Sequence, residues 1–434
     1  FSLPTILVLF LTLTIREILI RYQLKMKHLK SYSSQFVSAI IITLIPYLSI
    51  KSEENGLPST FEYDFKGYME YESRYFLKND RKKVASRTNQ SFATSFELFF
   101  GHINNDWSVL FAPLARIDQR DPARTILDIS EFYLAVNKPT WELKLGSKQF
   151  FWGVLESNHL IDIVNQTNSA QNIDLEDKFG QPMLNFTLIE KLGTIDFFLM
   201  TANRKRRFVS SEGRPHTGFE ELLKSGVFDN DRNQFDYIFR YENSGNIYDI
   251  GLYYFNGVAR RPSMIAASEQ RQSNLSIFYP KIQQLAVDLQ ITLGSTLFKL
   301  EGLFRESEIE DYGAFGLGFE HTIYGLFKTK KDLGLLIEYH WNQRNEDLDS
   351  QFSNDIFFGT RLISNAEDDG QILFGLLQNL NDGSTTAFME GSRRLPRNWK
   401  VFFEGRLFSL IDNNNSLADL NDDTYLQLAI TKFF

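Results

Sequence analysis

The 434-residue sequence contains no cysteine, which argues against a disulfide scaffold and against a metal site built on thiolates. Histidine is scarce, and the six residues lack the close spacing of a metal-ligand motif: they are His28, His102, His159, His216, His321 and His340. No stretch reaches the roughly 20 apolar residues that a membrane-spanning helix requires. The formal net charge is −8, so the chain lacks the basic balance of a nucleic-acid-binding protein. We therefore expect no metal, no cofactor and no nucleic-acid partner.

Aromatic residues, by contrast, are abundant. The chain has 40 Phe and 18 Tyr, and its aromatic share of 15% suits the aromatic girdles of a membrane-embedded β-barrel. The first regular segment, 61–77, alternates between two faces, and a period of two predicts a β-strand. Its apolar face carries Phe61, Tyr63, Phe65, Met69, Tyr71 and Tyr75, and its polar face carries Glu62, Asp64, Lys66, Glu70, Glu72 and Arg74.

The last segment, 423–434, also alternates, and it contains no turn and no charged tail. If it stayed unpaired, this strand would be a long apolar edge, which is prone to aggregation. Pairing with the strand at 61–77 would remove that edge and close a barrel. Segments of about ten residues with apolar side chains outward and polar side chains inward are typical of bacterial outer-membrane barrels.

Between these two segments the sequence predicts further strands, about eighteen in all. Connections after even-numbered strands are short, as at 103–106 and 191–193, and most connections after odd-numbered strands are long, as at 152–181 and 203–232. Short periplasmic turns and long extracellular loops alternate in this way in outer-membrane barrels. The predicted fold is all-β, a closed antiparallel transmembrane β-barrel of about 16–18 strands with 18 as the best estimate. The predicted spans are 61–77, 91–102, 107–118, 126–137, 141–151, 182–190, 194–202, 233–243, 247–257, 281–293, 296–306, 313–324, 332–343, 353–364, 370–379, 384–393, 397–409 and 423–434.

The segment before the first strand is predicted to serve targeting. Met26 is followed by basic residues and by the apolar run 36–45, a pattern typical of a secretory signal peptide. We expect 1–25 to be upstream read-through, 26–52 a signal peptide, 53–60 a short periplasmic lead-in and 61–434 the barrel. An extended leader is the alternative for the first segment. The expected location is the bacterial outer membrane.

Alternation along the predicted strands assigns the charged side chains to the interior. A charge on the lipid face near the midplane would cost roughly 2–4 kcal/mol for Arg or Lys, and a barrel of about 16–18 strands can hold an aqueous channel. Both signs are nearly balanced, which predicts weak charge selectivity unless the two signs lie on opposite walls of a narrow neck. The predicted pore-lining residues are Glu62, Glu70, Arg74, Arg240, Glu242, Lys299, Glu301, Arg305, Glu338, Arg361, Glu404 and Arg406.

The long connection 152–181 is the candidate for a constriction. It begins with Trp152 and Gly153, a rim aromatic residue followed by a residue that tolerates a sharp turn. We expect this connection to enter the barrel, with Asp162 and Asn165 as oxygen acceptors at the narrowest point. The alternative is that both side chains only cap a turn or a short loop helix.

Several short motifs resemble those of a known group of proteins. They are the segment 141–153 with its Trp-Gly end, the following Asp162-Ile-Val-Asn165, Tyr279-Pro280, Glu338-Tyr339, Arg393-Arg394 and the terminal Phe433-Phe434. On these residues the chain, over roughly 60–434, resembles a group of Gram-negative outer-membrane porin-like barrels that is akin to alginate-export barrels. The resemblance implies a barrel and a conduit, and it implies no particular substrate.

The expected function is an outer-membrane channel for the passive passage of small hydrophilic or amphipathic solutes, without catalysis. One alternative is a barrel that exports or assembles polysaccharide. Another is an outer-leaflet hydrolase, which would need a nucleophile, a base and an orienting acid that the sequence does not bring together. The expected partners are outer-membrane lipid, lipopolysaccharide through the basic run 204–207, and the barrel-assembly machinery through the strand that ends at Phe434. Monomer and trimer both stay open.

Overall fold

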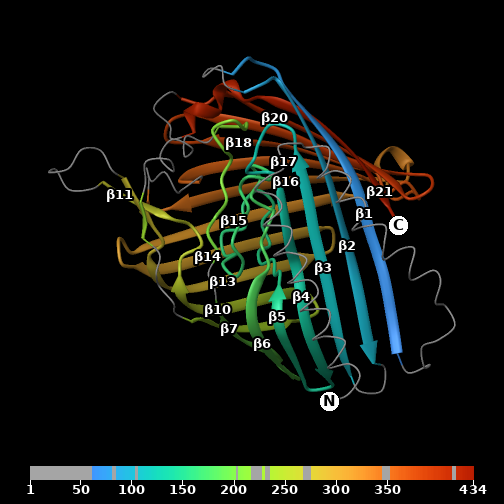
Figure 1. Cartoon of the computed structure of the whole chain (residues 1–434), viewed down its shortest axis with the longest axis vertical. Helices are drawn as coiled ribbons and strands as arrows, with labels where there is room; N and C mark the ends of the chain where they lie inside the picture. Colours follow the sequence, from blue (N-terminus) through green and yellow to red (C-terminus); the bar gives the residue numbers. More distant parts are fainter. Residues whose placement is uncertain are drawn as a thin grey trace, which may run out of the picture. The chain divides into compact units, whose positions relative to one another are not determined.

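The computed structural model describes residues 61–80, 85–102, 106–201, 204–216, 227–229, 235–266, 275–344, 352–412 and 417–434. Strand β1 (Phe61–Phe76) pairs with β2 (Thr88–His102) on one side and with β21 (Tyr425–Phe433) on the other. Eighteen strands are joined in this way into one closed antiparallel β-barrel (Figure 1). The other barrel strands are β3 (Trp107–Asp118), β4 (Ile126–Lys138), β5 (Trp141–Lys148), β6 (Gln181–Glu190), β7 (Gly193–Met200), β9 (Asp236–Ser244), β10 (Tyr248–Val258), β13 (Lys281–Leu293), β14 (Thr296–Ser307), β15 (Tyr312–Ile323), β16 (Lys331–Asn342), β17 (Asn354–Ser364), β18 (Gln371–Asn379), β19 (Thr385–Leu395) and β20 (Trp399–Leu410).

The predicted closed barrel is confirmed. Each predicted span coincides with one barrel strand, and the ends differ by about three residues at most. The predicted pairing of the first strand with the last is also confirmed, with Tyr71 opposite Ile430. A separate three-stranded sheet was not predicted, because its strands are too short to show a period. That sheet contains β8 (Val227–Asp229), β11 (Ser263–Ala266) and β12 (Leu275–Phe278), and two 3-10 turns, η1 (Leu326–Lys328) and η2 (Ala418–Asp422), complete the described elements.

The seam between β1 and β21 is fixed by the last residue of the chain. Gly67 and Phe434 exchange two backbone hydrogen bonds, of 2.9 and 3.0 Å. The ring of Phe434 covers Gly67 so closely that a Cβ on the glycine would lie 2.8 Å from it. The same ring packs beside Phe65, with 6.0 Å between the ring centroids. The missing side chain of Gly67 therefore makes room for the terminal ring at the point where the barrel closes.

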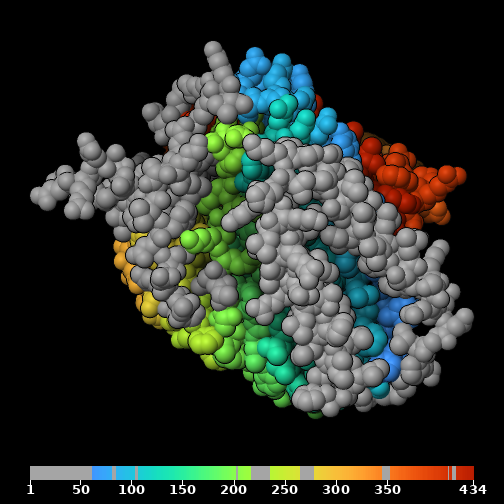
Figure 2. Space-filling model, in the orientation of Figure 1, coloured from blue at the N-terminus to red at the C-terminus, as the bar shows by residue number. Residues whose placement is uncertain are grey.

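Apolar side chains cover the outer face of the described strands. On β16, for example, Leu335 and Ile337 are exposed on the outside, whereas Glu338 and His340 point inward and are buried. This alternation follows directly from the two-residue period of a strand. In the space-filling view, blue atoms of the first strands lie next to red atoms of the last strands, as the closed ring requires (Figure 2). An apolar outer face is what a lipid environment requires.

The chain divides into two units, Phe1–Gly56 and Leu57–Phe434, and the barrel belongs to the second. The expected read-through segment, signal peptide and lead-in (1–25, 26–52 and 53–60) lie outside the described residues. Among the residues that are described, none belongs to a helix long and apolar enough to cross a membrane.

Candidate functional site

The connection between β5 and β6, residues 149–180, lies inside the barrel and is called the neck loop below. It contacts inward-facing side chains of strands on several sides of the barrel, namely β1, β10, β14, β16, β17, β20 and β21. The neck loop therefore crosses the interior and divides it.

Glu301, on the inner face of β14, holds the first half of the neck loop. Its carboxylate accepts hydrogen bonds from three backbone amides, those of Val154 (2.6 Å), Leu155 (3.0 Å) and Ile161 (3.2 Å). The side chain is completely buried. The loop approaches so closely because Gly153 has a φ of +134° and no Cβ, which would lie 3.0 Å from a Glu301 carboxylate oxygen. Hydrogen bonds to a carboxylate are stronger than neutral ones, so Glu301 is a firm anchor.

Glu338, on β16, is a second anchor and is linked to a serine and a histidine. Its carboxylate accepts hydrogen bonds from the amides of Glu156 (2.7 Å) and Ser157 (2.9 Å) and from the Ser157 hydroxyl (2.6 Å). Ser157 Oγ also lies 2.7 Å from His340 Nε2. In a nucleophilic triad the acid holds the imidazole nitrogen that faces away from the serine. Here Glu338 accepts the hydrogen bond from the Ser157 hydroxyl directly and lies 3.5 Å from the same Nε2. The arrangement ties the loop to the wall and differs from the geometry of a nucleophilic triad.

Asn165, which is buried, connects the two ends of the neck loop. Its Oδ1 accepts a hydrogen bond from the Phe150 amide, and its Nδ2 donates to the carbonyls of Lys148 and Phe179, all at 2.8 Å. Asp162 forms an ion pair with Lys178 of the same loop at 3.3 Å. Both predicted constriction residues are thus engaged in holding the loop together.

Trp152 is buried at the start of the loop. Its ring packs against Tyr253 and Phe198, with centroids 5.1 and 5.7 Å away, and the Arg240 guanidinium lies 4.4 Å above it. Trp152 therefore packs inside the barrel and does not belong to an outer aromatic girdle.

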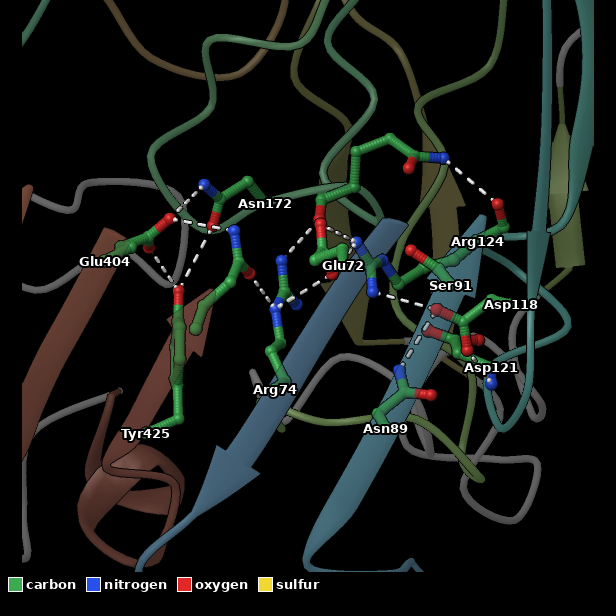
Figure 3. Close-up of polar contacts among 12 residues, drawn as sticks. Glu72, Arg74, Asn89, Ser91, Asp118, Asp121, Arg124, Asn172, Glu404 and Tyr425 are labelled. Atoms are coloured by element: carbon green, nitrogen blue, oxygen red, sulfur yellow. Dashed lines mark hydrogen bonds and ion pairs between the residues drawn. The ribbon is translucent and has the colours of Figure 1, made fainter. Parts of the chain in front are cut away.

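The second half of the neck loop reaches the wall near the closing seam (Figure 3). Arg74 donates to the carbonyl of Gln171 at 3.0 Å. Asn172 donates to the Glu404 carboxylate at 3.1 Å and accepts from the Tyr425 hydroxyl at 3.2 Å. The loop is therefore fixed at both halves, on opposite sides of the interior.

A cavity of ≈ 630 Å³, called the main cavity below, lies beside the neck loop. Its walls are the neck loop, residues of β1 and β3, Arg124 of the connection between β3 and β4, and residues of β17–β21. Four guanidinium groups and seven carboxyl groups line it: Arg74, Arg116, Arg124 and Arg361, and Glu70, Glu72, Glu156, Asp174, Asp177, Glu390 and Glu404.

The guanidinium groups of the main cavity are already paired. Arg116 forms ion pairs with Glu70 (3.0 Å) and Glu72 (3.1 Å), and Arg124 pairs with Glu72 at 2.8 Å. Asp177 of the neck loop, by contrast, is exposed and has no ion-pair partner within 4.0 Å in the part of the chain that the structure describes. The charge that faces water in the main cavity is therefore mainly negative.

Two carboxyl groups of the neck loop that line the main cavity have raised pKa values. Burial raises the pKa of Asp174 to about 7, although Arg406, 3.7 Å away, opposes the shift. The loss of bulk water inside the barrel raises the pKa of Asp177 as well, against the opposing effect of Arg116. Protonation of Asp174 therefore occurs close to neutral pH.

The other predicted lining residues are distributed over the interior, most of them in pairs. Arg240 pairs with Asp288 at 2.9 Å and with Glu242, and Lys299 pairs with Glu320 at 2.9 Å. Arg305 donates to Gln284 at 2.7 Å, Arg361 pairs with Glu156, Arg406 pairs with Glu404 at 2.8 Å, and Glu62 is exposed near the start of β1. Sequence reasoning missed the strand residues Arg116 and Glu390 of the main cavity. It also missed Arg124, Glu156, Asp174 and Asp177, because loop residues carry no period that reveals their direction. No cluster of metal-ligating side chains is found among the residues described.

A closed barrel of 18 strands, apolar outside and crossed by an internal loop, is a porin-like β-barrel. No family model matches the chain, and no curated protein is similar to it in sequence. Among solved structures, OccK5 (OpdH) of Pseudomonas aeruginosa is similar in fold, with 11% identity over 88% of this chain and 99% of that chain and a TM-score of 0.51. OpdO of the same organism (9% identity, 86% and 97% coverage, TM-score 0.47) and a variant of the Rh. blastica porin (10%, 86% and 100%, TM-score 0.42) also match. At these identities the likeness to OccK5 supports the fold alone, and the two lower TM-scores support no further argument.

Proposed function

We propose that the chain is a bacterial outer-membrane channel for the passive passage of small hydrophilic or amphipathic solutes. The observation that carries the proposal is the neck loop, which is bonded to the wall on opposite sides and leaves the main cavity of ≈ 630 Å³ beside it. Cavities of about 300–1,000 Å³ enclose one small organic molecule. A passage of this size suits single small solutes better than a polysaccharide chain or a folded protein.

The lining of the main cavity favours cations in this proposal. Seven carboxyl groups face four guanidinium groups, and the guanidinium groups of Arg116 and Arg124 are neutralised by wall carboxylates. This differs from the near balance of the predicted lining set, because Glu156, Asp174 and Asp177 belong to the neck loop and not to a strand. Charged groups at a constriction set the selectivity of a pore. Screening over about 8 Å at physiological salt keeps the preference moderate.

A catalytic role is not part of the proposal, because Glu338 binds the Ser157 hydroxyl itself and does not orient His340 from the far side. The proposed partners are lipid at the apolar outer face and the assembly machinery at the strand that ends with Phe434. Contact with lipopolysaccharide is proposed through the basic run 204–207.

Single-channel recording of the purified full-length barrel in planar bilayers tests the proposal. We expect stable ion conductance with a permeability ratio above one for K⁺ over Cl⁻. Swelling of liposomes that contain the protein should admit monosaccharides and amino acids and exclude oligosaccharides of several units. A folded protein that conducts no ions would contradict the channel, and swelling in long oligosaccharides would favour polysaccharide transport.

A further inference from the structure

The connection between β7 and β9 also contacts the neck loop, and its described residues 204–216 are called the strap below. The strap begins against the neck loop. Arg204 makes two hydrogen bonds of 3.0 Å to Asp128 on β4, and its guanidinium lies 4.0 Å above the ring of Phe179. The Arg204 carbonyl accepts a hydrogen bond of 2.9 Å from Gln166. Both Phe179 and Gln166 belong to the neck loop, so the start of the strap and the neck loop are in direct contact.

The middle of the strap lies against the connection between β3 and β4. Arg207 donates to the carbonyls of Pro122 (3.2 Å) and Thr125 (2.9 Å). The Ser210 amide donates to the Asp121 carboxylate at 3.2 Å. The strap thus extends from β7 past β4 and β3 toward the strands of the closing seam.

The strap ends on the outer end of the seam, where Arg214 is almost completely buried. Arg214 forms an ion pair of 2.5 Å with Asp423, and both side chains are 1% exposed. The same guanidinium donates to the carbonyls of Lys78 (3.1 Å) and Asp422 (2.7 Å) and lies 4.2 Å above the ring of Phe76. One side chain therefore joins the connection after β1, the connection before β21 and the strap.

The contacts next to this pair strengthen the attachment. The His216 amide donates to the second oxygen of Asp423 at 2.5 Å, and the His216 ring lies 3.2 Å from Asp80. Phe76 and Tyr425, the outermost paired residues of the seam, belong to one buried apolar cluster. Removal of one partner from a buried ion pair leaves an uncompensated charge, which is strongly unfavourable. The bonded state of the strap is therefore much more stable than a partly detached one.

We propose that the strap is a latch that connects the seam of the barrel to the neck loop, and that the Arg214–Asp423 ion pair holds the strap on the seam. Detachment of the strap releases Arg204 from Asp128 and from the neck loop, and so loosens the loop that borders the main cavity. The latch thus regulates access to the main cavity, and this part of the inference rests on the proposed channel function. The attachment itself does not depend on that function.

Limited trypsin digestion of the folded full-length protein tests the attachment, since the strap contains Lys205, Arg206 and Arg207 as cleavage sites. We expect Arg214→Glu and Asp423→Arg each to accelerate cleavage in the strap at least tenfold, which corresponds to about 1.4 kcal/mol. Arg214→Lys, which keeps the charge and loses the forked hydrogen bonds, should be intermediate. The double variant Arg214→Glu/Asp423→Arg restores opposite charges and should be cleaved at least threefold more slowly than either single variant.

Lys138→Glu is the matched control, because it reverses one partner of the exposed Lys138–Asp106 pair at a short turn. Cleavage of Arg214→Glu at the rate of this control would overturn the latch, and so would a double variant cleaved as fast as the single variants. In planar bilayers, Arg214→Glu should add current fluctuations that the control lacks. If the wild-type barrel does not conduct, the proposed channel function is refuted, and the digestion result still tests the attachment of the strap. If it conducts and Arg214→Glu is as quiet as the control, regulation by the latch is refuted.

Discussion

Glu301 offers the most direct test of how the neck loop is held, through the substitution Glu301→Gln. The native carboxylate accepts hydrogen bonds from the amides of Val154, Leu155 and Ile161, at 2.6 to 3.2 Å, and is fully buried. Glutamine has nearly the same shape but only one accepting oxygen. Its NH₂ group must then face a backbone N–H of the loop, either that of Ile161 or those of Val154 and Leu155.

The cost follows from the number of hydrogen bonds affected. One charge-assisted hydrogen bond, contributing about 1.5–3 kcal/mol, is lost, and the bonds that stay are weakened because the charge is gone. A loss of about 3 kcal/mol in total raises the population of the detached first half of the loop about a hundredfold. Glu338 still anchors Glu156 and Ser157, so we expect a loosened loop and not an empty barrel.

Single-channel recording is the assay, with Glu62→Gln as the control, because that substitution makes the same chemical change at an exposed site near the start of β1. We expect Glu301→Gln to increase open-channel noise and mean conductance, and Glu301→Gln/Glu338→Gln to increase both further. Retained heat-modifiable migration on gels would show that the barrel is folded. A folded Glu301→Gln barrel with the conductance and noise of the control would refute the anchoring role.

Three further predictions concern charge, pH and closure. Asp177→Asn removes the unpaired carboxylate of the main cavity, so the ratio of K⁺ to Cl⁻ permeability from reversal potentials should fall, whereas Glu62→Gln should leave it unchanged. Because the pKa of Asp174 is about 7, its negative charge is present above that pH and lost below it; cation preference should decline between pH 8 and pH 6, and Asp174→Asn should flatten the profile in that window. Phe434→Ala removes the ring that covers Gly67 at the seam, and a cross-strand aromatic contact contributes about 1 kcal/mol. The temperature of heat modification should therefore drop by a few degrees, and an unchanged temperature would contradict the role of the terminal ring.

The sequence was sufficient to predict the barrel and insufficient to predict its interior, for a physical reason. A strand residue has only two directions, and the apolar face of β16 at Leu335 and Ile337 settles that Glu338 points inward. Periodicity gives no information on what an inward side chain meets. Glu338 and Glu301 meet backbone amides of the neck loop, which come from residues about 140 to 180 positions away in the chain. Asn165 is a similar case: its side chain can bond its own loop or face a passage, and only the fold decides.

The interior charges consequently have two different tasks, and this division bears on selectivity. Charged side chains on the strands mostly form ion pairs with one another or bind the neck loop, as Arg116 pairs with Glu70 and Glu72. Such pairs present little net field to a solute, because the opposite charge lies about 3 Å away. The neck loop adds three carboxyl groups to the lining of the main cavity, Glu156, Asp174 and Asp177. Selectivity in this barrel should therefore change with substitutions in residues 149–180 more readily than with substitutions of strand charges, which would alter stability first.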